Sequence, residues 1–181
     1  MFQTMLKALF RDQNSKTDPQ SLYGEVVARA RSVSFFTEFG VPDTFDGRFE
    51  LMVMHVYLVI SRFNQEGNVA KEKSQHLFDL FLDDMSIGLR EAGVGDTTVP
   101  KRLKKMSRVF YGRAAAWDEA FASNEVDETL AKVFARNLFD LDAANANSMR
   151  LASYMIAEKA NLSARSYEEI GADEPIFSTP L

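Results

Sequence analysis

The sequence predicts an all-α protein, a single compact multi-helix domain of about six to seven helices around a central hydrophobic helix. Two observations favour this fold class. Apolar residues recur at spacings of three and four along most of the 181 residues, which places them on one face of a helix. No two-residue alternation persists, and no Asn-Gly or Asp-Gly turn joins two β-branched runs, so signals for strands and hairpins are nearly absent.

The chain divides into three expected segments. Residues 1–18 form a short amphipathic helix followed by a polar linker, residues 19–163 form the helical domain, and residues 164–181 form an irregular tail. A length of 181 residues fits one domain. The first helix has an apolar face, so it can lie on a membrane, dock on its own domain or stay disordered.

Inside the domain, a helix is expected over about 21–31, then a short helical turn that stops at Gly40, a good residue for ending a helix. The stretch 41–50 is a turn in which Thr44 or Asp46 caps the next helix. That next helix is apolar nearly all round, which is typical of a helix at the centre of a fold.

A fourth helix is expected over about 69–92, ended by Gly93. The connection after it supplies Thr97 or Thr98 as an N-cap and places Pro100 in the first turn of a fifth helix, where proline is well tolerated. Two further helices are expected at about 125–141 and 145–162.

The fifth helix concentrates positive charge. Residues 100–113 hold six basic side chains and no acidic one, whereas the rest of the chain has 15 basic against 26 acidic side chains. Like charges at these spacings repel by a few tenths of a kcal/mol per pair, so the pattern lowers helix stability. It indicates either a solvated outer face or a partner surface, whose candidate residues are Lys101, Arg102, Lys104, Lys105, Arg108 and Arg113.

Two features of the same helix concern its packing. One stripe is apolar and should face the core; it consists of Leu103, Met106, Phe110, Ala114, Trp117 and Phe121. The later half of the outer face carries small residues, Gly112 among them. Because glycine inside a helix is roughly 1 kcal/mol less favourable than alanine, we expect Gly112 to lie under a neighbouring helix or loop.

Exposed cations on one helix suit a phosphate backbone or an acidic protein surface. Specific DNA recognition is not expected, because Asp96, Thr97 and Thr98 precede the cations instead of the polar residues that usually contact bases at a helix start.

Catalytic and metal-binding motifs are scarce. The chain has no cysteine and no HExxH, GxSxG or phosphate-loop motif, so we expect no enzyme, no cofactor and no metal site. His55 is expected to be a hydrogen-bonded core residue. His76, Asp79 and Asp83, with Glu72 one turn earlier, lie on one side of the fourth helix; they form either an acidic solvated face or a hard-metal site.

No membrane-spanning helix is expected. The most apolar run covers only the ten residues 51–60, whereas a span needs about 20 residues. Together with the absence of cysteine, this indicates a cytoplasmic protein whose membrane contact is only peripheral, at the inner face of the cytoplasmic membrane.

Three motifs, in this order, resemble the ubiquinol–cytochrome c chaperone family: GVPDTFDGRFE, LREAGVGD and KKMSRVFYGR. The resemblance covers roughly residues 22–139. The residues that carry it are Pro42, Asp43, Asp46, Gly47, Arg48, Gly95, Asp96, Tyr111 and Gly112.

The resemblance implies a non-enzymatic assembly factor for respiratory complex III. Mitochondrial members, with a small helical partner protein, sit at the ribosomal tunnel exit and bind newly made cytochrome b. The basic helix would then contact the ribosome or an acidic surface, and an aromatic-rich groove beside it would hold a cytochrome b segment or a partner helix. The chain begins almost at the domain, so it resembles a bacterial member of the family.

Two other functions stay open at this point. One is a general RNA-binding helical module that uses the basic helix 101–113. The other is a carboxylate–metal enzyme that uses His76, Asp79 and Asp83.

Overall fold

The computed structural model describes residues 19–166, 169–170 and 175–178. The helix expected within residues 1–18 lies outside this part of the chain. Within it the fold is all-α, as predicted, and contains no strand. The elements are α2 (Pro19–Ala30), α3 (Ser34–Thr37), α4 (Phe45–Asn64), the 3₁₀ helix η2 (Gly67–Ala70), α5 (Lys71–Glu91), α6 (Val99–Phe121), α7 (Val126–Leu138) and α8 (Ala146–Ala164).

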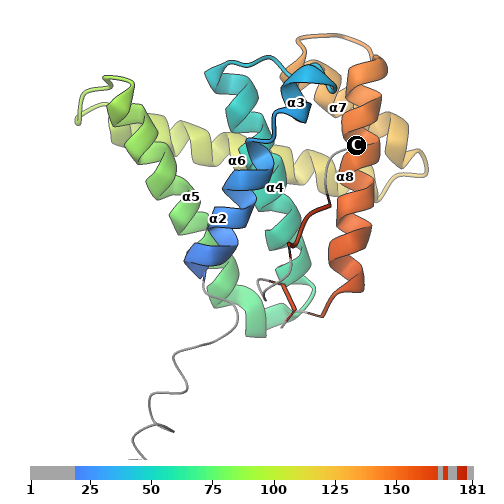
Figure 1. Ribbon diagram of the computed structural model, residues 1–181, viewed down its shortest axis with the longest axis horizontal. Helices are drawn as coiled ribbons and strands as arrows, with labels where there is room; N and C mark the ends of the chain where they lie inside the picture. The colour runs from blue at the N-terminus through green and yellow to red at the C-terminus, as the bar shows by residue number, and fades with distance from the viewer. Residues whose placement is uncertain (1–18, 167–168, 171–174, 179–181) are drawn as a thin grey trace, which may run out of the picture.

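Helix α4 is the central helix, as its sequence predicts. It contacts α2, α5, α6, α7 and α8, and Figure 1 shows α2 and α5 on one side of it, α8 on the other and α6 running across behind it. Its buried residues cover nearly its whole circumference, from Phe49 to Phe63. A helix that is apolar all round is stable only when other elements surround it, so α4 organises the packing of the rest.

The helix ends follow local signals in the sequence. The hydroxyl of Thr44 accepts a hydrogen bond from the amide of Gly47 at 3.1 Å and so caps α4, which decides between the two expected caps. Asn145 and Ser148 form a reciprocal capping box at the start of α8. Pro100 lies in the first turn of α6, as expected. Gly93 follows α5 with φ 80°, a backbone conformation that glycine adopts without strain.

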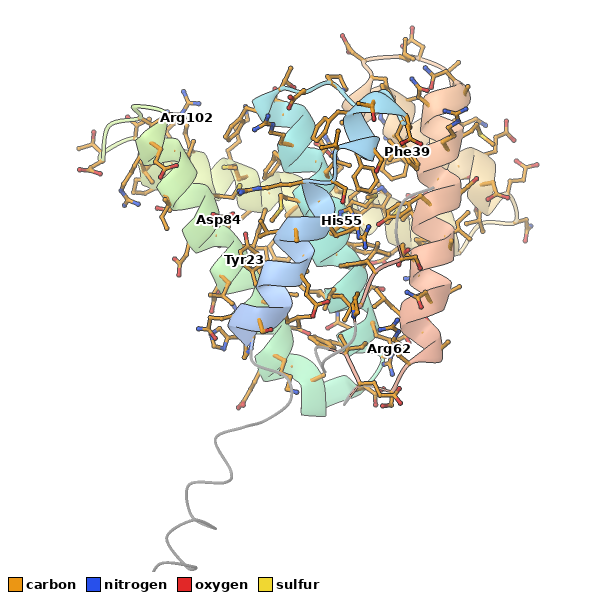
Figure 2. All side chains as sticks on the ribbon, in the orientation of Figure 1. Tyr23, Phe39, His55, Arg62, Asp84 and Arg102 are labelled. Carbon is orange, nitrogen blue, oxygen red and sulfur yellow. The ribbon has the colours of Figure 1, made fainter. Side chains whose placement is uncertain are left out.

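His55 lies in the core, as predicted. Its Nδ1 is 2.7 Å from the carbonyl oxygen of Leu51, and its Nε2 is 2.9 Å from the hydroxyl of Tyr154. Because a carbonyl can only accept, Nδ1 carries the proton and Nε2 accepts from the tyrosine. Burial lowers the pKa of His55 to about 4, so the ring is neutral at pH 7 (Figure 2).

Arg62 closes the end of α8 from the side of α4. It is buried, and its guanidinium donates to the carbonyl of Arg165 at 2.9 Å and to that of Leu162 at 3.2 Å. Leu162 lies in the last turn of α8, and Arg165 directly follows the helix. The carbonyl of Leu162 also accepts from the amide of Arg165, so Arg62 adds donors where the pattern of helical hydrogen bonds ends. Arg62 also pairs with Glu66, so one side chain joins two helices where α8 ends (Figure 2).

The apolar run 51–60 lies inside α4 and is surrounded by protein. Within the described ranges, none of the helices combines the length and the apolar character that crossing a bilayer requires.

Candidate functional site

The first motif residues build the turn that starts α4. Gly47 is buried, and a side-chain carbon on it would lie 2.0 Å from the carbonyl oxygen of Pro42. Only glycine therefore fits this position, because the backbone of the turn approaches it too closely for any Cβ. Together with the cap from Thr44, this contact determines the direction in which the chain enters α4.

Charged residues on the same turn are exposed. Arg48 donates to Asp43 at 2.6 Å, and this hydrogen bond lowers the pKa of Asp43. Exposed pairs of this kind contribute little to stability. Asp46 lies in the first turn of α4, where a negative charge interacts favourably with the helix dipole.

Helix α6 has the two faces that its sequence predicts. Met106, Phe110 and Trp117 are buried in the core, and the other three residues of the predicted stripe, Leu103, Ala114 and Phe121, pack against it partly buried. The cations on the opposite side are exposed; they are Lys101, Arg102, Lys104, Lys105 and Arg108.

These five cations are named here the α6 cations, and they have no acidic partner among the residues that the structure describes. Within the described part of the chain, no ion pair includes any of them. Other basic residues do pair with a carboxylate; they are Arg31, Arg48, Arg62, Arg90, Arg113 and Lys132. The positive charge of the α6 cations is therefore available to another molecule.

Arg113, the sixth basic residue singled out on this helix, has an internal partner. Its Nη2 lies 2.7 Å from Oε1 of Glu50 and its Nε lies 2.8 Å from Oε2. Only 22% of the Arg113 side chain and 11% of the Glu50 side chain are exposed. The ion pair is bidentate, and bidentate arginine–carboxylate pairs are among the stronger hydrogen-bonded ion pairs. It connects α6 to α4.

A groove of about 920 Å³ runs between the start of α4 and α6. Its apolar lining comes from Phe45, Phe49, Leu89, Met106 and Val109, and all five α6 cations line it as well. Phe49, Leu89 and Met106 are buried and form the floor, whereas the exposed cations form the rim. The groove therefore combines an apolar floor with a positive rim.

Two polar lining residues of this α4–α6 groove were not found from the sequence. Asn137 comes from α7, and its Nδ2 is buried without a hydrogen-bond partner; such an atom gains an acceptor when a ligand binds. Glu50 is the second. An acid so close to the apolar centre of α4 needs a cation nearby, and this could have indicated its pairing with Arg113.

The prediction for Gly112 is wrong. Gly112 is exposed, and a Cβ on it would meet nothing within 4 Å. Helices α5 and α7 pack on α6, whose apolar stripe they cover, so its outer face is left uncovered by the residues described. Tyr111 beside it is 60% exposed, although its ring packs against Phe78 at 5.4 Å.

The remaining motif residues lie in the connection between α5 and α6. Asp96 accepts from Nε of Arg90 at 3.1 Å, and Arg90 also donates to Ser86, so the connection is tied to the last turn of α5. Gly95 has nothing close to it that would exclude a side chain.

The acidic side of α5 shows no preformed metal site. His76, Asp79 and Asp83 are exposed, and Asp79 accepts from Gln75 at 2.7 Å. Over the residues that the structure describes, no three His, Asp or Glu side chains come together in a way that could hold a metal ion.

Known proteins resemble this chain in sequence. The family profile described as Ubiquinol-cytochrome C chaperone matches residues 37–177. The Ubiquinol-cytochrome-c reductase complex assembly factor 1 of Xenopus laevis is 25% identical over 130 residues, 72% of this chain and 64% of that protein. The human protein of that name is 27% identical over 119 residues, 66% of this chain and 39% of that protein. The chain thus spans less than two thirds of the length of these relatives.

A solved structure agrees with the sequence relatives. The crystal structure of the Cbp3 homolog from Brucella abortus superposes with a TM-score of 0.81 at 32% identity, over 96% of both chains. Profile, relatives and structure all match the same family that the three motifs indicate. The chain belongs to the ubiquinol-cytochrome C chaperone family.

Proposed function

We propose that this protein is a non-enzymatic assembly factor of ubiquinol–cytochrome c reductase, complex III, that binds newly made cytochrome b, and that the α4–α6 groove is the contact surface. Family membership and the names of the relatives support the process. The main observation in support of this contact surface is that the groove has an apolar floor beneath the five α6 cations.

The two parts of the groove have different physical effects. An apolar floor gains affinity by removing apolar surface of a bound segment from water. The cations at the rim speed the encounter and orient the bound segment. A newly made membrane protein exposes apolar segments that must be covered until they are assembled, and an amphipathic segment laid into a groove is a common recognition mode.

The test is an affinity purification of the tagged protein from gently solubilised cells, scored for cytochrome b. The Lys104→Glu/Lys105→Glu variant should recover at least tenfold less cytochrome b than the wild type. The matched control is Lys71→Glu/Lys132→Glu, which makes the same change in net charge on exposed residues outside the groove, and it should recover the wild-type amount. Ribosomal proteins and any small helical partner are scored in the same eluates.

A second pair of variants separates a protein client from RNA. Phe45 is 52% exposed in the groove, and Ile87 is 55% exposed on α5 outside it. Phe45→Ala should lower cytochrome b recovery severalfold and Ile87→Ala should not, because only the first removes part of the apolar lining. RNA held through its phosphates would depend on the cations and on salt but not on Phe45. A folded wild-type protein that recovers no cytochrome b would contradict the proposal.

A further inference from the structure

A short segment near the end of the chain, residues 175–178, which bends at Ile176 and Phe177, lies between α2 and α8, on a different side from the α4–α6 groove (Figure 1, dark red beside α8). We call it the strap. Its main chain is held by side chains. The amide of Ile176 donates to Glu25 at 2.9 Å, and Asn161 donates to the carbonyl of Ile176 at 3.1 Å. Arg29 donates to the carbonyl of Phe177 at 3.0 Å.

The two ends of the strap are held in the same way. The amide of Ser178 donates to Glu158 at 3.0 Å, and Arg165 donates to the carbonyl of Pro175 at 2.9 Å. Glu158 is only 2% exposed, and its other carboxylate oxygen accepts from Asn161. Polar groups from α2, α8 and the residue after α8 thus satisfy successive main-chain groups of the strap.

The strap contributes two adjacent apolar side chains to the core. Ile176 is completely buried and Phe177 is 4% exposed. The Phe177 ring packs edge-on against the ring of His55, with centroids 5.0 Å apart. Hydrogen bonds to the main chain do not depend on sequence, so selectivity at this place comes from these two apolar positions.

On the side of α2, the strap leaves some space unfilled. A cavity of about 210 Å³ adjoins the strap, lined by Pro175, Phe177 and residues of α2 with Ser32. Arg29 lines this cavity, and its Nε is buried without a hydrogen-bond partner. We call the site of the strap between α2 and α8 the α2–α8 groove. On its α2 side it has open space and a donor that the strap leaves unused, and an unused buried donor favours a ligand with an acceptor.

We propose that the α2–α8 groove is a peptide-binding site for a segment of another protein that carries two adjacent bulky apolar residues, and that the strap occupies this site until such a segment replaces it. The bound strap shows what the groove accepts: main-chain groups that hydrogen-bond to side chains of α2 and α8, and two adjacent apolar side chains that become buried. Peptide binding at this site does not depend on the proposed function, which supplies only the identity of the client.

The first experiment asks whether the strap leaves the groove while the rest stays folded. Native-state hydrogen exchange on the full wild-type chain measures the amides of Ile176 and Ser178 against those of buried α4 residues such as Val56 and Val59. We expect the strap amides to exchange at least a hundredfold faster than those of α4, through local opening. Equal protection of strap and α4 would mean that the strap is released only on global unfolding, and would overturn the proposal.

The second experiment supplies the ligand. The probe is a fluorescent synthetic peptide of residues 173–181, and its control carries serine at positions 176 and 177. The full chain with Ile176→Asp/Phe177→Asp, which cannot bury its own strap, should bind the probe at least tenfold more tightly than the wild type does. The reason is that a tethered strap competes at a high effective concentration. The control peptide should not bind either protein.

A folded Ile176→Asp/Phe177→Asp variant that fails to bind the probe overturns the proposal. An Ile176→Asp/Phe177→Asp variant that cannot fold would also overturn the proposal. It would mean that the chain needs the strap in order to fold, and a client could not then displace the strap. Neither outcome affects the proposal for the α4–α6 groove, because that proposal is tested separately with its own charge-reversal variants. The Ile176→Asp/Phe177→Asp chain retains every α6 cation.

Discussion

The side of the molecule that carries the α4–α6 groove and the side that carries the strap use their charged residues in opposite ways. The α6 cations are exposed and have no acidic partner among the described residues, whereas Glu25, Arg29 and Glu158 all bind main-chain groups of the strap. The charged groups that hold the strap are buried or half-buried, whereas the α6 cations lie exposed at the α4–α6 groove. Substitutions of the charged residues on the side that carries the strap should therefore change stability, and substitutions of the α6 cations at the α4–α6 groove should change binding.

The largest loss of stability is expected for Arg62→Met, on the side that carries the strap. Methionine keeps much of the buried bulk but removes the side-chain donor to the carbonyls of Leu162 and Arg165 and leaves Glu66 without its partner. Losing these contacts together should cost about 3 kcal/mol. Urea unfolding measures the change. The control is Arg48→Met, which removes an exposed pair and should change stability by less than about 1 kcal/mol; equal losses in the two variants would remove the distinction.

Gly47→Ala tests the turn that forms the α4–α6 groove. The added carbon would lie 2.0 Å from the carbonyl oxygen of Pro42, so the turn must shift, and we expect a loss of about 2 kcal/mol. Thermal unfolding measures this loss. Because Phe45 lies in the same turn region and lines the groove, client binding should weaken as well. Unchanged stability would mean that the turn can move at little cost.

The pH dependence of stability should reveal the neutral His55 in the core. Its pKa is lowered by burial to about 4 from an ordinary value near 6.5. Between these values the unfolded chain binds the proton and the folded chain does not, so stability falls as the pH decreases. We expect a loss of about 2 kcal/mol between pH 7 and pH 5, measured by urea unfolding at each pH. His55→Gln should show a much flatter pH dependence; an unaltered slope would assign the effect to other groups.

Gly112→Ala should have the opposite sign to Gly47→Ala. Nothing lies within 4 Å of the position that its Cβ would take, and α6 continues on both sides of it. Alanine in the interior of an exposed helix is then more stable by about 0.5–1 kcal/mol. Thermal unfolding measures the gain. A loss of client binding in this stabilised variant would show that a partner approaches α6 closely at Gly112.

The smallest effect is expected for Lys104→Gln/Lys105→Gln. Removing like charges from the outer face of α6 should stabilise the protein by a few tenths of a kcal/mol, while client capture falls. Both quantities are measured on the same preparation. Lower stability in this variant would mean that these lysines hold the fold together, as Arg113 does.

The helices could be predicted because their signals are local. Periodic apolar residues, the cap at Thr44, the proline at the start of α6 and the glycine after α5 each act within a few residues. Most expected boundaries therefore agree with the structure to within a few residues. The exposure of the α6 cations could also be predicted, because the same periodicity that buries Phe110 turns them away from the core.

The contacts that join distant parts of the chain could not be predicted in the same way. The Arg113–Glu50 pair spans 63 positions and the Ile176–Glu25 bond spans 151. No periodicity connects such residues, so the partner of Arg113 and the burial of the strap emerge only when the helices pack. Gly112 is an example of a tertiary contact that was predicted from the sequence but is not formed. A glycine in a helix indicates a close neighbour only if some element packs on that face, and none of the described ones does.

The sequence by itself determined the all-α class, the central place of α4, the two faces of α6 and, through three motifs, the family. These depend on local propensity and on which side chains must avoid water. Only the tertiary structure decided that the α6 cations border a groove, that Arg113 is used internally and that a strap fills the space between α2 and α8. The physical reason is that a groove or an ion pair belongs to surfaces from different helices, and their meeting depends on how the whole core packs.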